Sequence, residues 1–178
     1  ELAIVKPDEL ILKNLGNEII TPYVQKLDME LAAIEKNGYD HFMLKEIFEQ
    51  PQTIFDSLRG RMDAKRNQIT LSGIDAIADK IMAARRIIIV ACGTSWHSAL
   101  VAEYVIEELC RINVEVEYAS EFRYRNPMIS SEDVIIAISQ SGETADTLVA
   151  LENAKEQGAT IYGLVNVVGS SIARISNA

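Results

Sequence analysis

The sequence predicts a protein of the α/β class, a three-layer αβα sandwich around a mostly parallel sheet, preceded by helices and a short β-rich tail. Two runs of residues, Ile87–Ala91 and Val134–Ile138, are continuously apolar, as strands covered on both faces are. Each run leads through a short loop of small residues into a helical pattern, and the last helix is followed by a further β-prone run. This alternation of strand and helix is typical of βαβ units.

The N-terminal part, residues 1–38, is expected to be a tail and a linker. Leu2–Val5 and Leu10–Ile20 are β-prone, and the residues Asn14 to Asn17 indicate a hairpin turn in which Gly16 takes a positive φ. The segment Met29–Lys36 predicts a helix that the following Asn-Gly pair ends.

Three amphipathic helices are predicted next, over residues 41–50, 53–62 and 72–83, with Pro51 opening the second of them. Their apolar positions recur at helical spacing. These positions are Met43, Leu44, Ile47, Phe48, Ile54, Phe55, Leu58, Met62, Ile74, Ile77, Ala78, Ile81 and Met82. The faces they form are expected to pack against the core, a partner subunit or both.

The sheet is expected to contain four strands. The helix after the first apolar run extends to Cys110, and Val114–Tyr118 alternates, with Glu115 and Glu117 on one face, as an edge strand does. A helix from Thr144 to Gln157 ends at Gly158, and residues 161–167 form the last strand. Numbered from Ile87, the predicted strand order is 2-1-3-4, the order of a flavodoxin-like sheet.

This order places two loops side by side, because the chain reverses direction between the first and third strands. Ligands of open α/β sheets bind outside the carboxyl ends of strands at such a reversal. The loops are Cys92–Ser95 and Ser139–Thr144, and both lead into helices. The candidate binding residues are Gly93, Thr94, Ser95, Ser139, Gln140, Ser141, Gly142 and Thr144.

These residues suit an uncharged cradle for a phosphate. Helix N-termini attract anions, the hydroxyl and amide side chains add donors, and Gly142 lets the backbone approach the ligand. Neither GxxxxGK[ST] nor GxGxxG is present, so one phosphate on a small molecule fits better than a nucleotide, and no cofactor or metal is predicted. Ser and Thr at helix starts are usually plain N-caps, but two such loops at one reversal favour binding.

Several other residues have structural interpretations that we prefer. Cys92 is expected to be a small buried residue, and His97 to lie at the surface or behind the site, so neither is assigned a catalytic role. Glu143 and Asp146 are interpreted as favourable charges in the first turn of a helix. Arg123 and Arg125 are expected to form ion pairs at a subunit interface rather than to bind phosphate.

Composition narrows the possible partners. The chain has 178 residues, of which 48% are hydrophobic and 24% charged, and its net charge is -9. An acidic surface repels nucleic acid and anionic lipid, so neither is expected as a partner. Cys92 and Cys110 have no CxxC spacing, which favours reduced thiols in a cytoplasmic protein. No apolar run is long enough to span a bilayer.

The stretches ACGTSWHSA, ASEFRYR and SQSGETADTL resemble the first sugar isomerase (SIS) domain of the glucosamine-6-phosphate synthase family, the glutamine–fructose-6-phosphate amidotransferases. The stretch HFMLKEIFEQP resembles that family's entry into its isomerase half. The resemblance implies that residues 1–38 are the end of a glutaminase domain and a linker. It also implies that residues 39–178 are a C-terminally truncated first SIS domain.

The resemblance further implies a function. The family converts fructose 6-phosphate and glutamine into glucosamine 6-phosphate and glutamate, is cytoplasmic and forms homodimers. Ser139, Gln140, Ser141 and Thr144 match its phosphate-binding positions, and Thr94 and Ser95 match contacts from the first loop. Its catalytic lysine, glutamate and histidine have no match here, so this chain alone is expected to bind the sugar phosphate without converting it. The alternative is a phosphosugar-sensing regulatory module without catalysis.

Overall fold

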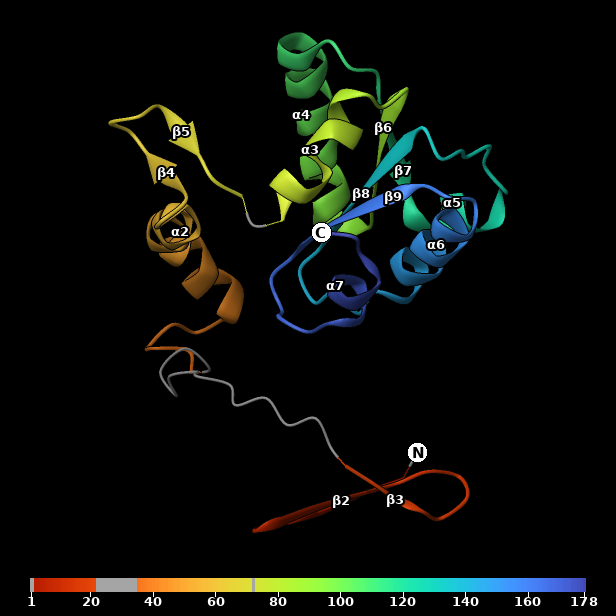
Figure 1. Ribbon diagram of the computed structural model, residues 1–178. Coiled ribbons are helices and arrows are strands. Elements are labelled where there is room, and N and C mark those ends of the chain that lie inside the picture. The colour runs from red at the N-terminus through yellow and green to blue at the C-terminus, as the bar shows by residue number, and fades with distance from the viewer. Residues whose placement is uncertain (1, 22–34, 72) are drawn as a thin grey trace. The chain divides into compact units, whose positions relative to one another are not determined.

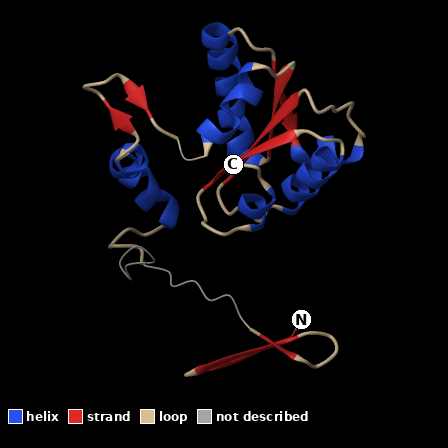
Figure 2. Cartoon of the chain, viewed as in Figure 1, coloured by secondary structure: helices blue, strands red, loops and turns tan. Residues whose placement is uncertain are grey.

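The computed structural model describes residues 2–21, 35–71 and 73–178 (Figures 1 and 2). Internal contacts divide the chain into two units, Glu1–Arg59 and Gly60–Ala178. Each unit is described by itself.

The first unit begins with a small antiparallel sheet of order β1-β2-β3. Its strands are β1 (Leu2–Lys6), β2 (Glu9–Lys13) and β3 (Ile19–Ile20). The predicted turn lies between β2 and β3, but the residue with positive φ is Asn17 (φ 63), not Gly16. Asn tolerates this conformation because its side chain bonds locally, here by accepting the Lys13 ammonium at 3.0 Å. Most of the predicted helix Met29–Lys36 lies outside the described residues.

Helix α2 (Phe42–Leu58) runs through Pro51 without a break. The prediction that Pro51 opens a second helix is therefore wrong. A proline inside a helix removes one backbone donor and weakens the helix, but here the helix continues to Leu58. Most of its apolar stripe is exposed in this unit. The exposed members are Phe42, Met43, Leu44, Ile47, Phe48, Ile54, Phe55 and Leu58.

The second unit begins with a hairpin that the sequence did not predict. Its strands are β4 (Met62–Asp63) and β5 (Gln68–Ile69), so Met62 belongs to a strand and not to a helix. Helix α3 (Ile74–Met82) follows. Ile77 is its buried anchor, whereas Met82, expected on the same stripe, is exposed.

The core of this unit is a parallel sheet of order β7-β6-β8-β9, which confirms the predicted order. The strands are β6 (Arg86–Ala91), β7 (Val114–Tyr118), β8 (Asp133–Ser139) and β9 (Thr160–Val165). Strand β9 ends two residues before the predicted Val167. The two continuous apolar runs are the central strands, as full burial on both faces requires.

Helices cover both faces of the sheet, which confirms the three-layer architecture (Figure 1). On one face, Ile87 and Ile89 pack with Ala99 of α4 (Gly93–Cys110) and with Ile81 of α3. On the other, Ile88 and Val90 pack with residues of three further helices. These are α5 (Ala119–Tyr124), α6 (Ala145–Glu156) and α7 (Ser171–Ile175). Helices α5 and α7 are too short for their periodicity to predict them.

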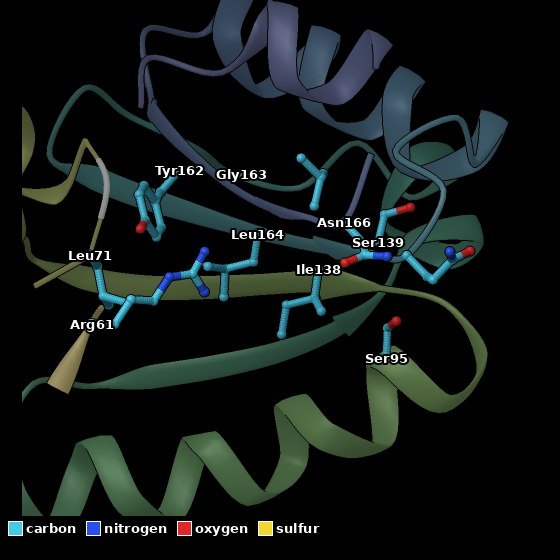
Figure 3. A pocket seen from close by; sticks show the side chains of 11 residues that line it. Arg61, Leu71, Ser95, Ile138, Ser139, Tyr162, Gly163, Leu164 and Asn166 are labelled. Atoms are coloured by element: carbon cyan, nitrogen blue, oxygen red, sulfur yellow. The ribbon is translucent and has the colours of Figure 1, made fainter. Parts of the chain in front are cut away.

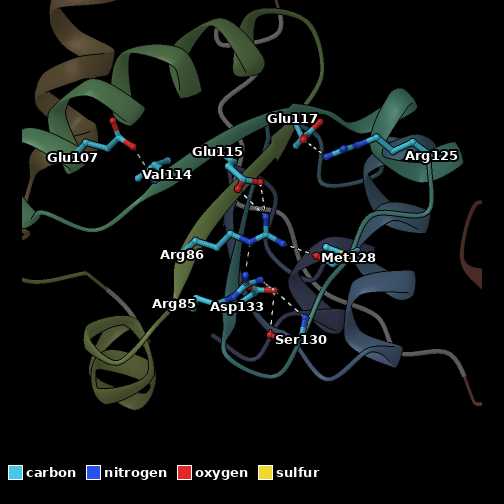
Figure 4. Close-up of polar contacts among 10 residues, drawn as sticks. All are labelled: Arg85, Arg86, Glu107, Val114, Glu115, Glu117, Arg125, Met128, Ser130 and Asp133. Atoms are coloured by element: carbon cyan, nitrogen blue, oxygen red, sulfur yellow. Dashed lines mark hydrogen bonds and ion pairs between the residues drawn. The ribbon is translucent and has the colours of Figure 1, made fainter.

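A network of ion pairs joins the amino ends of the central strands (Figure 4). The Asp133 side chain, 0% exposed, accepts hydrogen bonds from Arg85 at 2.9 Å and from Arg86 Nε at 3.1 Å. Arg86 also donates to Glu115 of β7 at 2.7 Å. The amide of Ser130 completes the shell of Asp133 at 2.8 Å. Because Arg86, Asp133 and Glu115 lie on three neighbouring strands, the network fixes their relative register.

Acid will weaken this network at a pH set by Asp133. Burial alone would raise the pKa of Asp133, but hydrogen bonds from Arg86 and Ser130 outweigh it and hold that pKa below its ordinary value. The unfolded chain therefore binds the proton more readily, and stability falls as pH drops below about 4. We expect urea unfolding from pH 6 to pH 2.5 to show a smaller loss for Asp133→Asn than for the wild type. Equal losses would contradict this assignment.

Arg123 and Arg125 form ion pairs within the chain. Arg123 Nη1 lies 3.0 Å from Asp146 Oδ1 and so joins α5 to α6. Arg125 pairs with Glu117 of β7.

Candidate functional site

The two predicted loops meet at one cavity of about 290 Å³, at the carboxyl ends of β6 and β8. These strands are adjacent, and Ala91 pairs in register with Ile138 at their ends. Of the eight predicted binding residues, all but Gly142 line this cavity. Cys92 and Ile138 complete the lining. None of these described lining residues carries a formal charge, so the cavity is uncharged, as expected.

The first loop is tight because only Cys92 separates the end of β6 from the start of α4 at Gly93. Gly93 has φ 59, and the space where a side chain would stand is open. Its amide donates to the hydroxyl of Tyr118 at 3.1 Å, and the Trp96 ring lies 5.2 Å from the Tyr118 ring. Tyr118, at the end of β7, thus supports this loop. Nothing in the sequence around Tyr118 indicated that role.

The second loop is shaped by its own hydroxyls. Ser139 Oγ is buried, accepts from the Gly142 amide at 3.0 Å and lies 3.2 Å from Thr144 Oγ1. Ser141 Oγ accepts from the Glu143 amide at 3.2 Å. Thr144 occupies the N-cap position of α6, yet its side chain makes no capping hydrogen bond. Its hydroxyl instead contacts Ser139 Oγ, and Thr144 lines the cavity.

Gly142 makes a close contact that the sequence did not predict. It has φ 67, and a side chain there would meet Ser170: its Cβ would lie 2.0 Å from Ser170 Oγ and 2.5 Å from Ser170 Cβ. Gly142 therefore permits the close approach of Ser170, the residue that precedes α7. Because Ser170 is 28 residues further along the chain, the sequence carried no sign of this contact.

Three ionisable residues near the loops, Glu143, Asp146 and His97, do not line the cavity. Glu143 Oε1 accepts from the Ser171 amide at 2.7 Å, and this hydrogen bond holds the pKa of Glu143 below its ordinary value. Glu143 thus binds the start of α7 and does not lie in the first turn of α6. Asp146 does lie in that turn, as expected. His97 is exposed, with Nδ1 2.9 Å from the Gly93 carbonyl oxygen. These positions favour the structural interpretations over catalytic ones.

A second cavity of about 440 Å³ adjoins the first and shares Ser95, Ile138, Ser139 and Gln140 with it. Figure 3 shows Arg61 and Leu71 on one side of it and Ser95 and Asn166 on the other. Burial raises the pKa of Tyr162 in its wall, an effect that Arg61 opposes. The sequence did not predict these residues as neighbours, because only the tertiary fold brings the residues that flank the β4–β5 hairpin next to strand β9.

Among the described residues, no group of three or more His, Cys, Asp and Glu side chains is placed to hold a metal ion. Nor does any helix in the described ranges combine the length and apolarity needed to cross a membrane.

Residues 80–178 match the family model of the SIS domain. The chain belongs to the SIS domain family. Both loops of the candidate site lie inside the matched region of this SIS domain. The match begins within α3, so the first unit and the β4–β5 hairpin precede it.

Similar proteins extend the comparison beyond the SIS domain. The chain is 54% identical over 178 residues to a glutamine–fructose-6-phosphate aminotransferase (isomerizing) of Bacteroides thetaiotaomicron, covering 99% of this chain and 29% of that protein. It is 55% identical over 174 residues to the protein of that name in Chlorobaculum tepidum, covering 98% and 28%. The chain therefore spans less than a third of the length of these relatives.

A solved structure agrees with the fold. The C-terminal domain of glucosamine-fructose-6-phosphate aminotransferase from Francisella tularensis superposes with a TM-score of 0.71 at 38% identity. The superposition covers 80% of this chain and 40% of that one. The parallel sheet flanked by helices is thus the architecture of this SIS domain neighbour.

Proposed function

We propose that the chain is the sugar-phosphate-binding part of a glutamine–fructose-6-phosphate aminotransferase. Such an enzyme makes glucosamine 6-phosphate and glutamate from fructose 6-phosphate and glutamine. The observation that carries the proposal is the meeting of two hydroxyl-rich loops, each opening a helix, at one uncharged cavity. Two relatives of this name, above 50% identical along nearly the whole chain, support it.

The chain's own part in the reaction is to hold and orient the phosphate. Neither α4 nor α6 has a capping hydrogen bond from its N-cap side chain, so amides of their first turns other than that of Gly93, which donates to Tyr118, can bind an anion. Thr94, Ser95 and Thr144 add hydroxyl donors, and Gln140 adds an amide. Backbone amides and hydroxyls bind a dianion without formal charge, and the helix dipoles favour it.

The proposal also covers the domain organisation of the chain and the state of the whole protein. Residues 1–38 would be the end of a glutamine amidotransferase domain and a linker, and residues 39–178 would lead into and form the first SIS domain. The whole protein would be a cytoplasmic homodimer. A regulatory module that senses a phosphosugar is the weaker candidate, because the similarity to aminotransferases also covers residues before the SIS match.

Calorimetry on the 178-residue chain tests the ligand class. We expect fructose 6-phosphate to bind and fructose and adenosine monophosphate not to bind, because the cavity offers donors to a phosphate but no feature that recognises a nucleobase. Equal binding of adenosine monophosphate, or no binding of fructose 6-phosphate, would refute the assignment.

Thr144 tests the contact with the phosphate. Thr144→Val keeps the shape of the side chain but removes its hydroxyl, so it should weaken fructose 6-phosphate binding by about 1.5 kcal/mol, roughly tenfold in Kd. Thr144→Ser keeps the hydroxyl and serves as the matched control, with a Kd near that of the wild type. A valine variant that binds as tightly as the serine variant would remove Thr144 from the site.

A further inference from the structure

The middle of the second loop is tied to α7 rather than to the cavity. Ser139, Gln140, Ser141 and Thr144 line the cavity, but Gly142 and Glu143 do not. The Gly142 carbonyl accepts from the Ile172 amide at 3.0 Å. The Glu143 carboxylate accepts from the Ser171 amide at 2.7 Å. Hydrogen bonds from the start of α7 thus hold the loop at two consecutive residues, Gly142 and Glu143.

The hydrogen bond of Glu143 is stronger than one between uncharged groups. A carboxylate that accepts from a backbone amide forms a charge-assisted hydrogen bond, and the start of a helix favours a negative charge. The same bond keeps the pKa of Glu143 below its ordinary value, so the side chain is charged at neutral pH. Arg174, which donates to Ser171 Oγ at 2.8 Å, places a positive charge on the same turn.

This charge works against the ligand proposed for the site. In the sequence, Glu143 lies between two cavity-lining residues, Ser141 and Thr144, and its negative charge repels a phosphate bound in the cavity. A glutamate at this position therefore weakens anion binding through its charge, unless its hydrogen bond to Ser171 strengthens binding by more than the charge weakens it.

We propose that Glu143 is a positioning residue, whose hydrogen bond to the Ser171 amide holds residues 139–144 in the geometry that binds phosphate. It acts through the loop and does not touch the ligand. Without this bond, the loop keeps its contacts with Ile172 and Ser170 at Gly142, but residue 143 is no longer fixed to α7, so the hydroxyls of Ser141 and Thr144 are held less firmly. The inference rests on the proposed function, because the loop geometry matters for binding only if a phosphate binds there.

Two variants separate the hydrogen bond from the charge. Glu143→Gln keeps an oxygen acceptor for Ser171 and removes the charge, so it should bind fructose 6-phosphate as tightly as the wild type or more tightly. Glu143→Ala removes both, and its Kd should rise at least fivefold. Asp146→Asn removes a nearby charge without touching α7, and its Kd should stay within threefold of the wild type. Equal Kd values for Glu143→Gln and Glu143→Ala would overturn the proposal.

Amide hydrogen exchange on the unliganded chain gives a second readout that needs no ligand. In Glu143→Ala, the amides of Gly142 and Ile172 should exchange at least tenfold faster, while those of β8 remain unchanged, and Glu143→Gln should resemble the wild type. Unchanged exchange at Gly142 and Ile172 would refute the positioning role. If the wild type fails to bind fructose 6-phosphate, the proposed function falls, and the exchange rates still decide whether Glu143 holds the loop.

Discussion

Replacing Asp133 by alanine will lower the free energy of unfolding by about 3–5 kcal/mol, the cost of removing one partner from a buried ion pair. The Asp133 carboxylate is fully buried and accepts from Arg85, Arg86 and the Ser130 amide. Without the Asp133 carboxylate, Arg86 keeps Glu115 as an ion-pair partner but loses its buried one. The Arg86 side chain is only 15% exposed. Urea unfolding followed by circular dichroism measures the difference.

The neighbouring residue supplies the control for Asp133. Glu132 is also acidic but exposed, so Glu132→Ala should change the free energy of unfolding by less than about 0.5 kcal/mol. Similar losses for the two alanine variants would show that burial and the arginine contacts do not set the effect.

Gly142→Ala will destabilise the chain by roughly 2–5 kcal/mol. A left-handed backbone costs a residue with a side chain about 1–2 kcal/mol. Overpacking adds about 1–3 kcal/mol, because the new methyl group would stand 2.0 Å from Ser170 Oγ. Thermal or urea unfolding gives the total, and the displaced loop should also bind fructose 6-phosphate more weakly.

Gly93 separates the two causes. Its φ is also positive, at 59, but nothing lies within 4 Å of the position of an added Cβ. Gly93→Ala should therefore cost only the backbone part, about 1–2 kcal/mol. Adding Ser170→Gly to Gly142→Ala should recover the overpacking part. If Gly142→Ala costs no more than Gly93→Ala, the contact with Ser170 is not what requires glycine.

The sheet and the two loops were predictable because their signals are local. The continuous apolar runs identified the central strands, and Glu115 and Glu117 identified the edge strand. Strand order then placed the loops together, since carboxyl ends of adjacent parallel strands share one edge. Each of these steps needs only a few consecutive residues.

The sequence missed the continuity of α2 and the contacts that join distant residues. Pro51 is tolerated inside α2, although proline usually begins a helix. Gly142 packs against Ser170. Asp133 accepts hydrogen bonds from Arg85 and Arg86, almost fifty residues earlier in the chain. The partner of each is fixed by the tertiary fold, so no pattern near Gly142 or Asp133 reveals it.

A crystal structure of the chain with fructose 6-phosphate tests the central claim most directly. The account predicts the phosphate in the cavity between the two loops, with its oxygens about 2.7–3.1 Å from the Thr144 hydroxyl and from amides in the first turns of α4 and α6. A phosphate bound at any other place on the chain would contradict it.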